Sequence, residues 1–168
     1  MTAQRQEGNA LRHGLATIGL AALLLWPAGS LAWAEGATTQ RIVVDRHTGL
    51  AIDGFDPVAY FTDGEARSGV ADFEATAAGA IWRFRGASNR AAFLSHPGIY
   101  APQFGGHDPV GIARGVPLRG NPTIWLISGQ RLYLFSRQED RDAFAADPER
   151  ILAQAQQQWP ALLATLAE

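Results

Sequence analysis

The chain has 168 residues, a formal charge of −2 and no cysteine. Its 14 basic residues are all arginine, and its one methionine is the initiator. Without cysteine the protein has no disulfide, thiolate nucleophile, cysteine-ligated zinc or iron–sulfur cluster, and without lysine it has no Schiff base. The near-neutral charge predicts no nucleic-acid partner, because a nucleic-acid interface needs a basic face.

The first 34 residues have the pattern of a secretory signal peptide. Arg5 and Arg12 precede an apolar run from Leu15 to Trp26, and Ala32 and Ala34 are the small residues that a signal peptidase reads. This apolar run is shorter than the roughly 20 residues that cross a bilayer core. We therefore predict Sec-type export with cleavage after Ala34, a periplasmic or secreted protein, and no membrane span after cleavage.

Residues 35–52 are expected to lead into the domain. Arg41–Asp45 has the apolar composition of a short strand, and Thr48–Gly54 reads as a loop. Residues 53–168 then form one domain, which is an ordinary length for a single hydrophobic core.

An internal repeat organises this domain. Asp56-Pro57-Val58 recurs as Asp108-Pro109-Val110, an offset of 52 residues, and further identities follow at an offset of 51. The sequence therefore predicts two units, residues 56–100 and 108–151. The identities at the second offset pair Phe84 with Phe135, Arg90 with Arg141, Ala92 with Ala143, Phe93 with Phe144, and Pro97 with Pro148.

Each unit has the pattern of a hairpin followed by a helix. Alternating aromatic residues lie at 81–85 and 131–135, each after a turn signal, and the strands before the turns are expected at 72–76 and 123–127. Together they predict an α+β fold, with two hairpin-plus-helix units around an antiparallel sheet.

The ends of the helices are also predicted from local signals. Ser136-Arg137-Gln138-Glu139 reads as a capping box in the second unit, with Ser88 or Asn89 as the cap in the first. Pro97 and Pro148 stop the helices. Ile151, Leu152, Ala155 and Trp159 recur at helical spacing, which predicts a C-terminal helix with a packing face, and Pro160 opens a last turn.

Four segments resemble the exported YHS-domain proteins of bacteria: Asp53–Phe61, Ala87–Phe93, Tyr100–Gly106 and Trp159–Leu162. The resemblance covers roughly residues 53–162. It implies a small exported α+β domain of a group often linked to metal handling, most of whose members have no established activity.

The chain departs from that group at its usual cysteine positions. After the double glycine the exported group usually has tyrosine and then cysteine, where this chain has His107 and Asp108. Metal-binding members of the wider family carry further cysteines, where this chain has Ala59, Gly111, Arg85 and Ser136. A thiolate site for copper(I) or zinc therefore does not carry over.

The best remaining candidate site is Gly105-Gly106-His107-Asp108, together with Asp56 and Tyr60. The two glycines allow a close backbone approach to a ligand, and an imidazole beside a carboxylate suits zinc, copper(II) or nickel. His107 and Asp108 are the expected metal ligands. The competing interpretation is that each Asp-Pro starts a turn, with its carboxylate accepting hydrogen bonds from amides two residues on.

Two functions follow from these observations. The first is a non-catalytic exported binding module of YHS type for a metal ion or small ligand, without the usual cysteine site. The alternative is an interaction or assembly protein with an exported protein partner, which keeps the fold without a ligand site. No catalytic residues are predicted, because no triad, phosphate loop or His-x-x-x-His pair is present. The sequence leaves the oligomeric state open.

Overall fold

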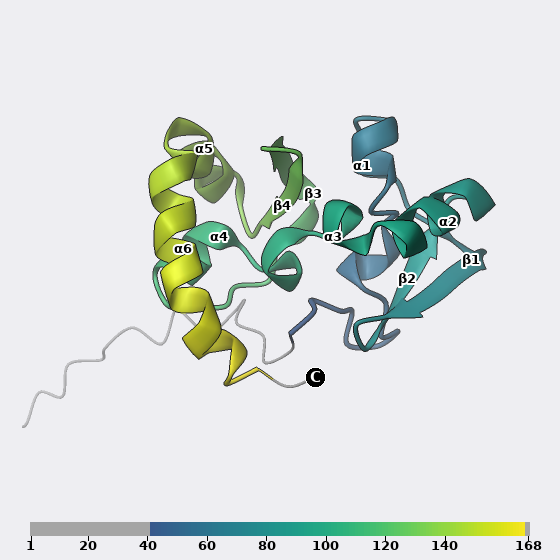
Figure 1. Ribbon diagram of the computed structural model, residues 1–168, viewed down its shortest axis with the longest axis horizontal. Helices are drawn as coiled ribbons and strands as arrows, with labels where there is room; N and C mark the ends of the chain where they lie inside the picture. The colour runs from purple at the N-terminus through teal and green to yellow at the C-terminus, as the bar shows by residue number, and fades with distance from the viewer. Residues whose placement is uncertain (1–40, 167–168) are drawn as a thin grey trace, which may run out of the picture. The chain divides into compact units, whose positions relative to one another are not determined.

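The computed structural model describes residues 41–166. It combines short helices with antiparallel hairpins and ends in a longer helix, which confirms the α+β class (Figure 1). The expected signal peptide and residues 35–40 of the lead-in segment lie outside the described residues. Within residues 41–166 no helix is long and apolar enough to cross a membrane.

The elements occur twice in the same order. Each half has a 3₁₀ turn, a short helix, a hairpin and two further helices. The first half consists of the turn Ile52–Gly54, α1 (Ala59–Thr62), β1 (Val70–Ala77), β2 (Ala80–Phe84), α2 (Ala87–Ser95) and α3 (Pro97–Tyr100). The second consists of the turn Gln103–Gly106, α4 (Pro109–Ala113), β3 (Asn121–Ser128), β4 (Arg131–Phe135), α5 (Gln138–Ala146) and α6 (Pro148–Leu163).

The two hairpins have the same geometry, displaced by 51 residues. Ala77 pairs with Ala80 and Ser128 with Arg131, and each pair closes a two-residue turn. Both residues of each turn have positive φ, the type I′ geometry that matches the twist of the flanking strands. The φ values are 51° at Ala78, 77° at Gly79, 55° at Gly129 and 58° at Gln130.

The hairpins form two separate sheets. Among the described residues β1 pairs only with β2, and β3 only with β4, so the single sheet that we expected is divided in two. Each first strand is longer than predicted because a bulge extends it toward its start, between Val70 and Glu74 in β1 and between Asn121 and Trp125 in β3.

Strand β4 contributes to both hydrophobic cores. Leu132 and Leu134 pack in the first core with Trp82 and Phe93, and Tyr133 and Phe135 face the second core. Since successive side chains of a strand point to opposite faces, β4 separates the two cores and is buried on both sides. The second core is completed by Val110, Phe144 and Ile151.

Helix α6 covers the second half with the predicted face. Ile151 and Ala155 are buried, and the Trp159 ring lies 5.6 Å from the ring of Phe104. The expected stop between two helices is confirmed, because α5 ends at Ala146 and α6 begins at Pro148. Pro160 does not open a separate turn, since α6 continues through it to Leu163.

Two local predictions were wrong. Arg41–Asp45 is not a strand, because its only β pairing in the described part of the chain is an isolated bridge from Val44 to Ala51. The capping box at 136–139 does not form. Arg137 occupies the N-cap without a side-chain hydrogen bond, because the Ser136 hydroxyl is drawn to buried carboxylates. In the first half Gly86 holds the N-cap, and the Asn89 side chain also turns to a carboxylate.

We expect Leu132→Ala to lower the free energy of unfolding by about 3 kcal/mol, because it opens a cavity in a fully buried site. Ile81 occupies the corresponding position of β2 and is 37% exposed, so Ile81→Ala should cost about 1 kcal/mol or less. Urea denaturation of both variants measures the difference. Equal losses would contradict the placement of β4 between two cores.

Candidate functional site

The two Asp-Pro-Val segments have the same role in the two halves. Asp56 accepts a hydrogen bond from the Val58 amide at 2.9 Å, and Asp108 accepts one from the Val110 amide at 2.8 Å. These are the amides two residues on, so the turn interpretation is confirmed. Both carboxylates are fully buried.

The second oxygen of each aspartate binds the loop that follows the hairpin. The Arg85 amide donates to Asp56 Oδ2 at 2.8 Å, and the Ser136 amide donates to Asp108 Oδ2 at the same distance. Each aspartate therefore joins the start of its half to the beginning of the helix after the hairpin. A buried carboxylate at this position is stable because it accepts several hydrogen bonds.

The halves differ in the next partner of the aspartate. Asn89 Nδ2 donates to Asp56 Oδ2 at 2.7 Å. The residue 51 positions further on is Asp140, which has no donor to offer when it is ionised. Asp140 is 2% exposed, so the second half contains two buried carboxyl groups where the first half has a carboxylate and an amide.

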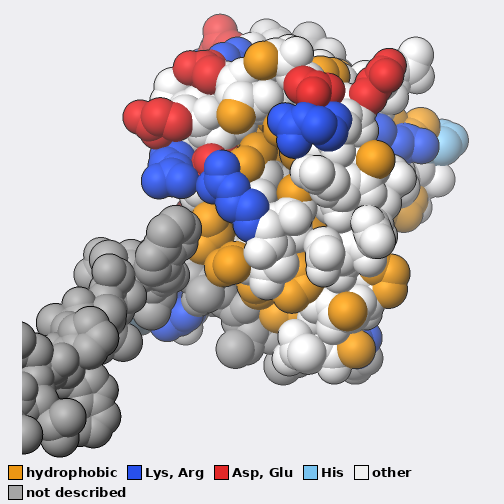
Figure 2. All heavy atoms as spheres, turned by 90° about the vertical axis from the view of Figure 1, so that its left-hand side faces the viewer, with side chains coloured by type: hydrophobic (Ala, Val, Ile, Leu, Met, Phe, Trp, Pro, Cys, Tyr) orange, Lys and Arg blue, Asp and Glu red, His pale blue; other side chains and the backbone are white. Residues whose placement is uncertain are grey.

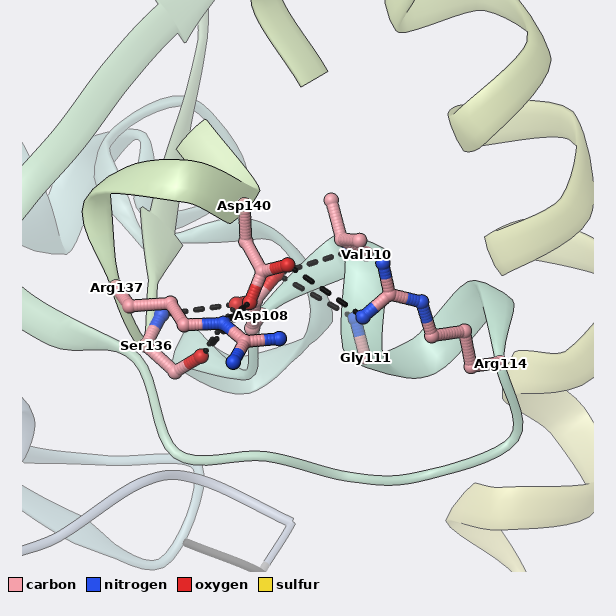
Figure 3. A network of polar contacts seen from close by, with 7 residues as sticks. All are labelled: Asp108, Val110, Gly111, Arg114, Ser136, Arg137 and Asp140. Atoms are coloured by element: carbon pink, nitrogen blue, oxygen red, sulfur yellow. Dashed lines mark hydrogen bonds and ion pairs between the residues drawn. The ribbon is translucent and has the colours of Figure 1, made fainter. Parts of the chain in front are cut away.

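Ser136 is within hydrogen-bond distance of both carboxyl groups of the second half (Figure 3). Its Oγ is 2.8 Å from Asp108 Oδ2 and 3.2 Å from Asp140 Oδ2. Burial raises the pKa of Asp108 above its usual value, the hydrogen bonds from Ser136 lower it, and the negative charge of Asp140 raises it again.

Two arginines approach Asp140 from the solvent side. Arg137 Nε lies 2.8 Å from Asp140 Oδ2, and Arg114 Nη1 lies 3.5 Å from Asp140 Oδ1. About half of each arginine side chain is exposed. The hydrogen bond to Asp140 raises the pKa of Arg137. Figure 3 shows the two guanidinium groups converging on Asp140 from the start of α5 and the end of α4.

Tyr60 packs and bonds within the fold. Its hydroxyl donates to the Pro122 carbonyl oxygen at 2.9 Å, and its ring meets the Trp125 ring edge-on at 5.2 Å. Burial, with a contribution from the charge of Asp56, raises the pKa of the Tyr60 phenol above its usual value. The predicted ligand residue thus connects the first half to the start of β3.

The two glycines bring backbone segments together. Gly105 has φ of +64°, its carbonyl oxygen accepts from the Val43 amide at 2.8 Å, and a Cβ at this position would collide with the Arg41 carbonyl. The Gly106 carbonyl oxygen accepts from the Gly120 amide at 3.0 Å. The close approach that we expected for a ligand is made by the protein's own chain.

His107 is completely buried. Its Nδ1 lies 2.7 Å from the carbonyl oxygen of Phe104, and its ring is 5.6 Å from that of Trp159. Asp108 is its chain neighbour, but both oxygens of Asp108 already accept hydrogen bonds. Residues 41–166 contain no group of three or more His, Asp and Glu side chains that could hold a metal ion.

Charges of both signs are mixed on the surface. Figure 2 shows acidic and basic side chains side by side in the upper part of one face, at the height of α5 and the start of α6 in Figure 1. Arg150 pairs with Asp147 at 2.7 Å, and Arg141 approaches Asp142 at 3.3 Å. This face therefore presents no patch of a single sign.

The sequence interpretation missed Asn89, Ser136 and Asp140 as partners of the two aspartates. A signal for them was present in the repeat, because Asn89 and Asp140 are equivalent at the offset of 51. An amide at one position and an acid at the equivalent position of the other unit indicate that the two units differ in their hydrogen bonds. Identities between the two units do not reveal this difference.

Comparisons with known proteins add no relative: no family model, no curated protein and no solved structure matches this chain.

We expect Asp56→Ala to lower the free energy of unfolding by about 3 kcal/mol, because it leaves the buried Val58 amide, the Arg85 amide and the Asn89 side chain without their acceptor. Asp63→Ala, at a partly exposed position nearby in the chain, should change stability by about 0.5 kcal/mol or less. Chemical denaturation measures both. A small loss for Asp56→Ala would contradict its role as the tie between the two segments.

Proposed function

We propose that this chain is a non-catalytic exported binding module of YHS type that binds another polypeptide through its surface. Export and the YHS relationship rest on the sequence patterns of residues 1–34 and 53–162. The choice of a polypeptide ligand rests on one structural observation, a groove along the free edge of β3.

The groove has a volume of about 710 Å³ and is open to solvent. Five consecutive residues of β3 line it, from Thr123 to Ile127. Because successive side chains of a strand point to opposite faces, a groove that touches all five runs along the strand edge. Tyr60, Gly64, Gln138 and Arg141 complete its walls.

Backbone hydrogen-bonding groups of β3 face this groove. In a hairpin with a two-residue turn, the residues that flank the turn form a hydrogen-bonded pair, and hydrogen-bonded pairs then alternate with non-hydrogen-bonded pairs along the two strands. Ser128 and Leu126 are therefore the residues of β3 whose backbone groups bond to β4. Trp125 and Ile127 therefore direct their backbone groups away from β4. The Trp125 carbonyl accepts from Arg141 Nε at 3.0 Å, as this register requires. Within residues 41–166, the outward amides of Trp125 and Ile127 and the Ile127 carbonyl have no backbone partner.

The composition of β3 favours an uncharged, extended segment as the partner. β3 carries no charged residue, whereas the equivalent strand β1 carries Asp72 and Glu74. Charges on an edge strand discourage pairing with another strand, and β3 lacks that protection. An extended peptide that adds to β3 would gain main-chain hydrogen bonds, with apolar side chains in the groove.

Three of the residues first expected to bind a metal or small ligand form hydrogen bonds within the fold. Asp56 and Asp108 are occupied by backbone amides, and Tyr60 by a carbonyl. If such a carboxylate bound a metal ion, the N–H groups that now donate to it would lose their acceptor, and this loss would offset the free energy of metal binding.

The metal alternative gives a separate prediction. A ligand raises the melting temperature only when it binds the folded state. Because Asp56, Asp108 and Tyr60 already form hydrogen bonds within the fold, we expect zinc, copper(II) or nickel to leave the melting temperature of the protein unchanged. The measurement is a thermal melt with and without each ion, with His107→Ala as the control variant. A stabilisation that His107→Ala abolishes would contradict the interaction proposal and support the metal site.

The proposal itself is tested with peptides selected from a random library on the protein. We expect Ile127→Pro to reduce their affinity at least about tenfold, because proline removes an outward N–H that the β3–β4 ladder does not use. Thr76→Pro is the matched control, since Thr76 occupies the same register position on β1 and should leave affinity unchanged. Thermal melting verifies that both variants fold.

A second measurement does not depend on the variants. Methylation of alternate amide nitrogens in a selected peptide should abolish its binding to the wild-type protein, because strand addition needs those donors. Binding unaffected by methylation and by Ile127→Pro would overturn the proposal. So would a dimer in solution that Ile127→Pro dissociates, because the edge would then belong to a second copy of the chain.

A further inference from the structure

The protein contains an internal comparison for its buried acids. In both halves an aspartate binds the amide two residues on and the amide of the loop after the hairpin. The third donor is the Asn89 side chain in the first half and the Ser136 hydroxyl in the second, where Asp140 occupies the position of Asn89 and also contacts that hydroxyl. The second half thus replaces a hydrogen-bond donor by a like charge at an otherwise matching position.

Ser136 cannot satisfy both acids when both are ionised. Its hydroxyl has one hydrogen, and two carboxyl oxygens lie within 3.2 Å of Oγ. If Asp108 receives that hydrogen, Asp140 and Ser136 meet as two acceptors. One added proton resolves the conflict, because a protonated Asp108 donates to Oγ while Oγ donates to Asp140, which Arg137 also contacts. The equivalent network of the first half needs no proton, since Asn89 supplies the hydrogen.

The second half also carries the charges that an acid pair needs. Arg137 and Arg114 contact Asp140, and the residues 51 positions earlier are Gly86 and Asp63. The two arginines that contact Asp140 therefore have no basic counterpart at these two positions, although Arg85 of the first half occupies the position of Ser136. The two cations hold Asp140 in place without supplying the hydrogen between Ser136 and the carboxyl groups.

Other charged groups on the neighbouring elements are engaged elsewhere or act from a distance. Arg131 of β4 donates to the Gly98 carbonyl, and Arg119 of the preceding loop pairs with Asp53. On α5, Arg141 approaches Asp142, and Glu139 acts on Arg137 through its charge. On α6, Asp147 and Arg150 pair with each other.

We propose that Asp108, Ser136 and Asp140 form a proton-operated clamp between α4 and α5, which tightens in acid and weakens when its proton leaves. The first half has no such clamp because Asn89 replaces the second acid. Helix α5 is therefore the element whose attachment depends on pH, and α2, its counterpart, is the built-in reference.

The raised pKa of Asp108 fixes the direction of the effect. A carboxyl group whose pKa is higher in the folded state than in the unfolded state binds its proton more tightly in the folded state. Its contribution to stability is complete below the unfolded pKa of 3.8 and is lost as the pH rises through the folded value. Within that window the folding equilibrium constant should fall by about tenfold per pH unit for the one proton.

The test compares urea denaturation from pH 4 to pH 8 for the wild type and two exchanged variants. Asp140→Asn gives the second half the donor of the first, and we expect it to remove the loss of stability with rising pH and to stabilise the protein at neutral pH. Asn89→Asp gives the first half an acid pair without counterparts of Arg114 and Arg137, and we expect it to add a second loss. A wild-type pH profile retained in Asp140→Asn would overturn the proposal.

Carboxyl ¹³C chemical shifts provide a readout on the wild type alone. We expect the Asp108 carboxyl to titrate above 3.8 in the wild type, because burial and the negative charge of Asp140 raise its pKa. In Asp140→Asn the titration of Asp108 should move to lower pH. Titration of Asp108 at or below 3.8 in the wild type would overturn the proposal without reference to any variant.

Discussion

A fully buried aspartate near the start of each half is the constraint on which the rest of the fold depends. Asp56 and Asp108 each join a short helix to a loop 29 or 28 residues further along the chain. A buried carboxylate is unfavourable unless several donors reach it, so the hairpin between the two segments must return its end to that point. The same requirement, met twice, gives the two halves their common order of elements.

The halves share this framework and differ in what surrounds it. β4 is buried on both faces because it separates two cores, whereas Ile81 of β2 is partly exposed. α6 extends to Leu163 and covers α4, whereas its counterpart α3 ends after one turn at Tyr100. The second half therefore supplies both the shared strand and the longer covering helix. The acid pair and the β3 groove also belong to this half.

The polar residues that first suggested a ligand site act mainly within the fold. Asp56, Asp108, Tyr60, Gly105 and Gly106 all accept or donate hydrogen bonds that join segments of the chain. The interaction site that we propose is the edge of β3, where the outward amides of Trp125 and Ile127 have no backbone partner within residues 41–166. The clamp and the groove are close in sequence, because Asp140 precedes Arg141, whose Nε reaches the Trp125 carbonyl. A change in the attachment of α5 would act directly on that edge.

The sequence by itself determined the α+β class and the two hairpins with their turns, and it offered the Asp-Pro turn as one of two interpretations. These features follow from local rules: alternation of apolar residues, positive φ at turn residues, and short-range hydrogen bonds. Tertiary structure decided that the hairpins form two sheets, that Ser136 leaves the expected capping box, and that Gly105 contacts the chain near Arg41. It also brought Asp140 to Asp108, 32 positions away in the sequence. These contacts join residues that are far apart in the sequence, and they depend on which donors the fold places next to a buried acceptor. Local sequence patterns contain no information about such distant partners.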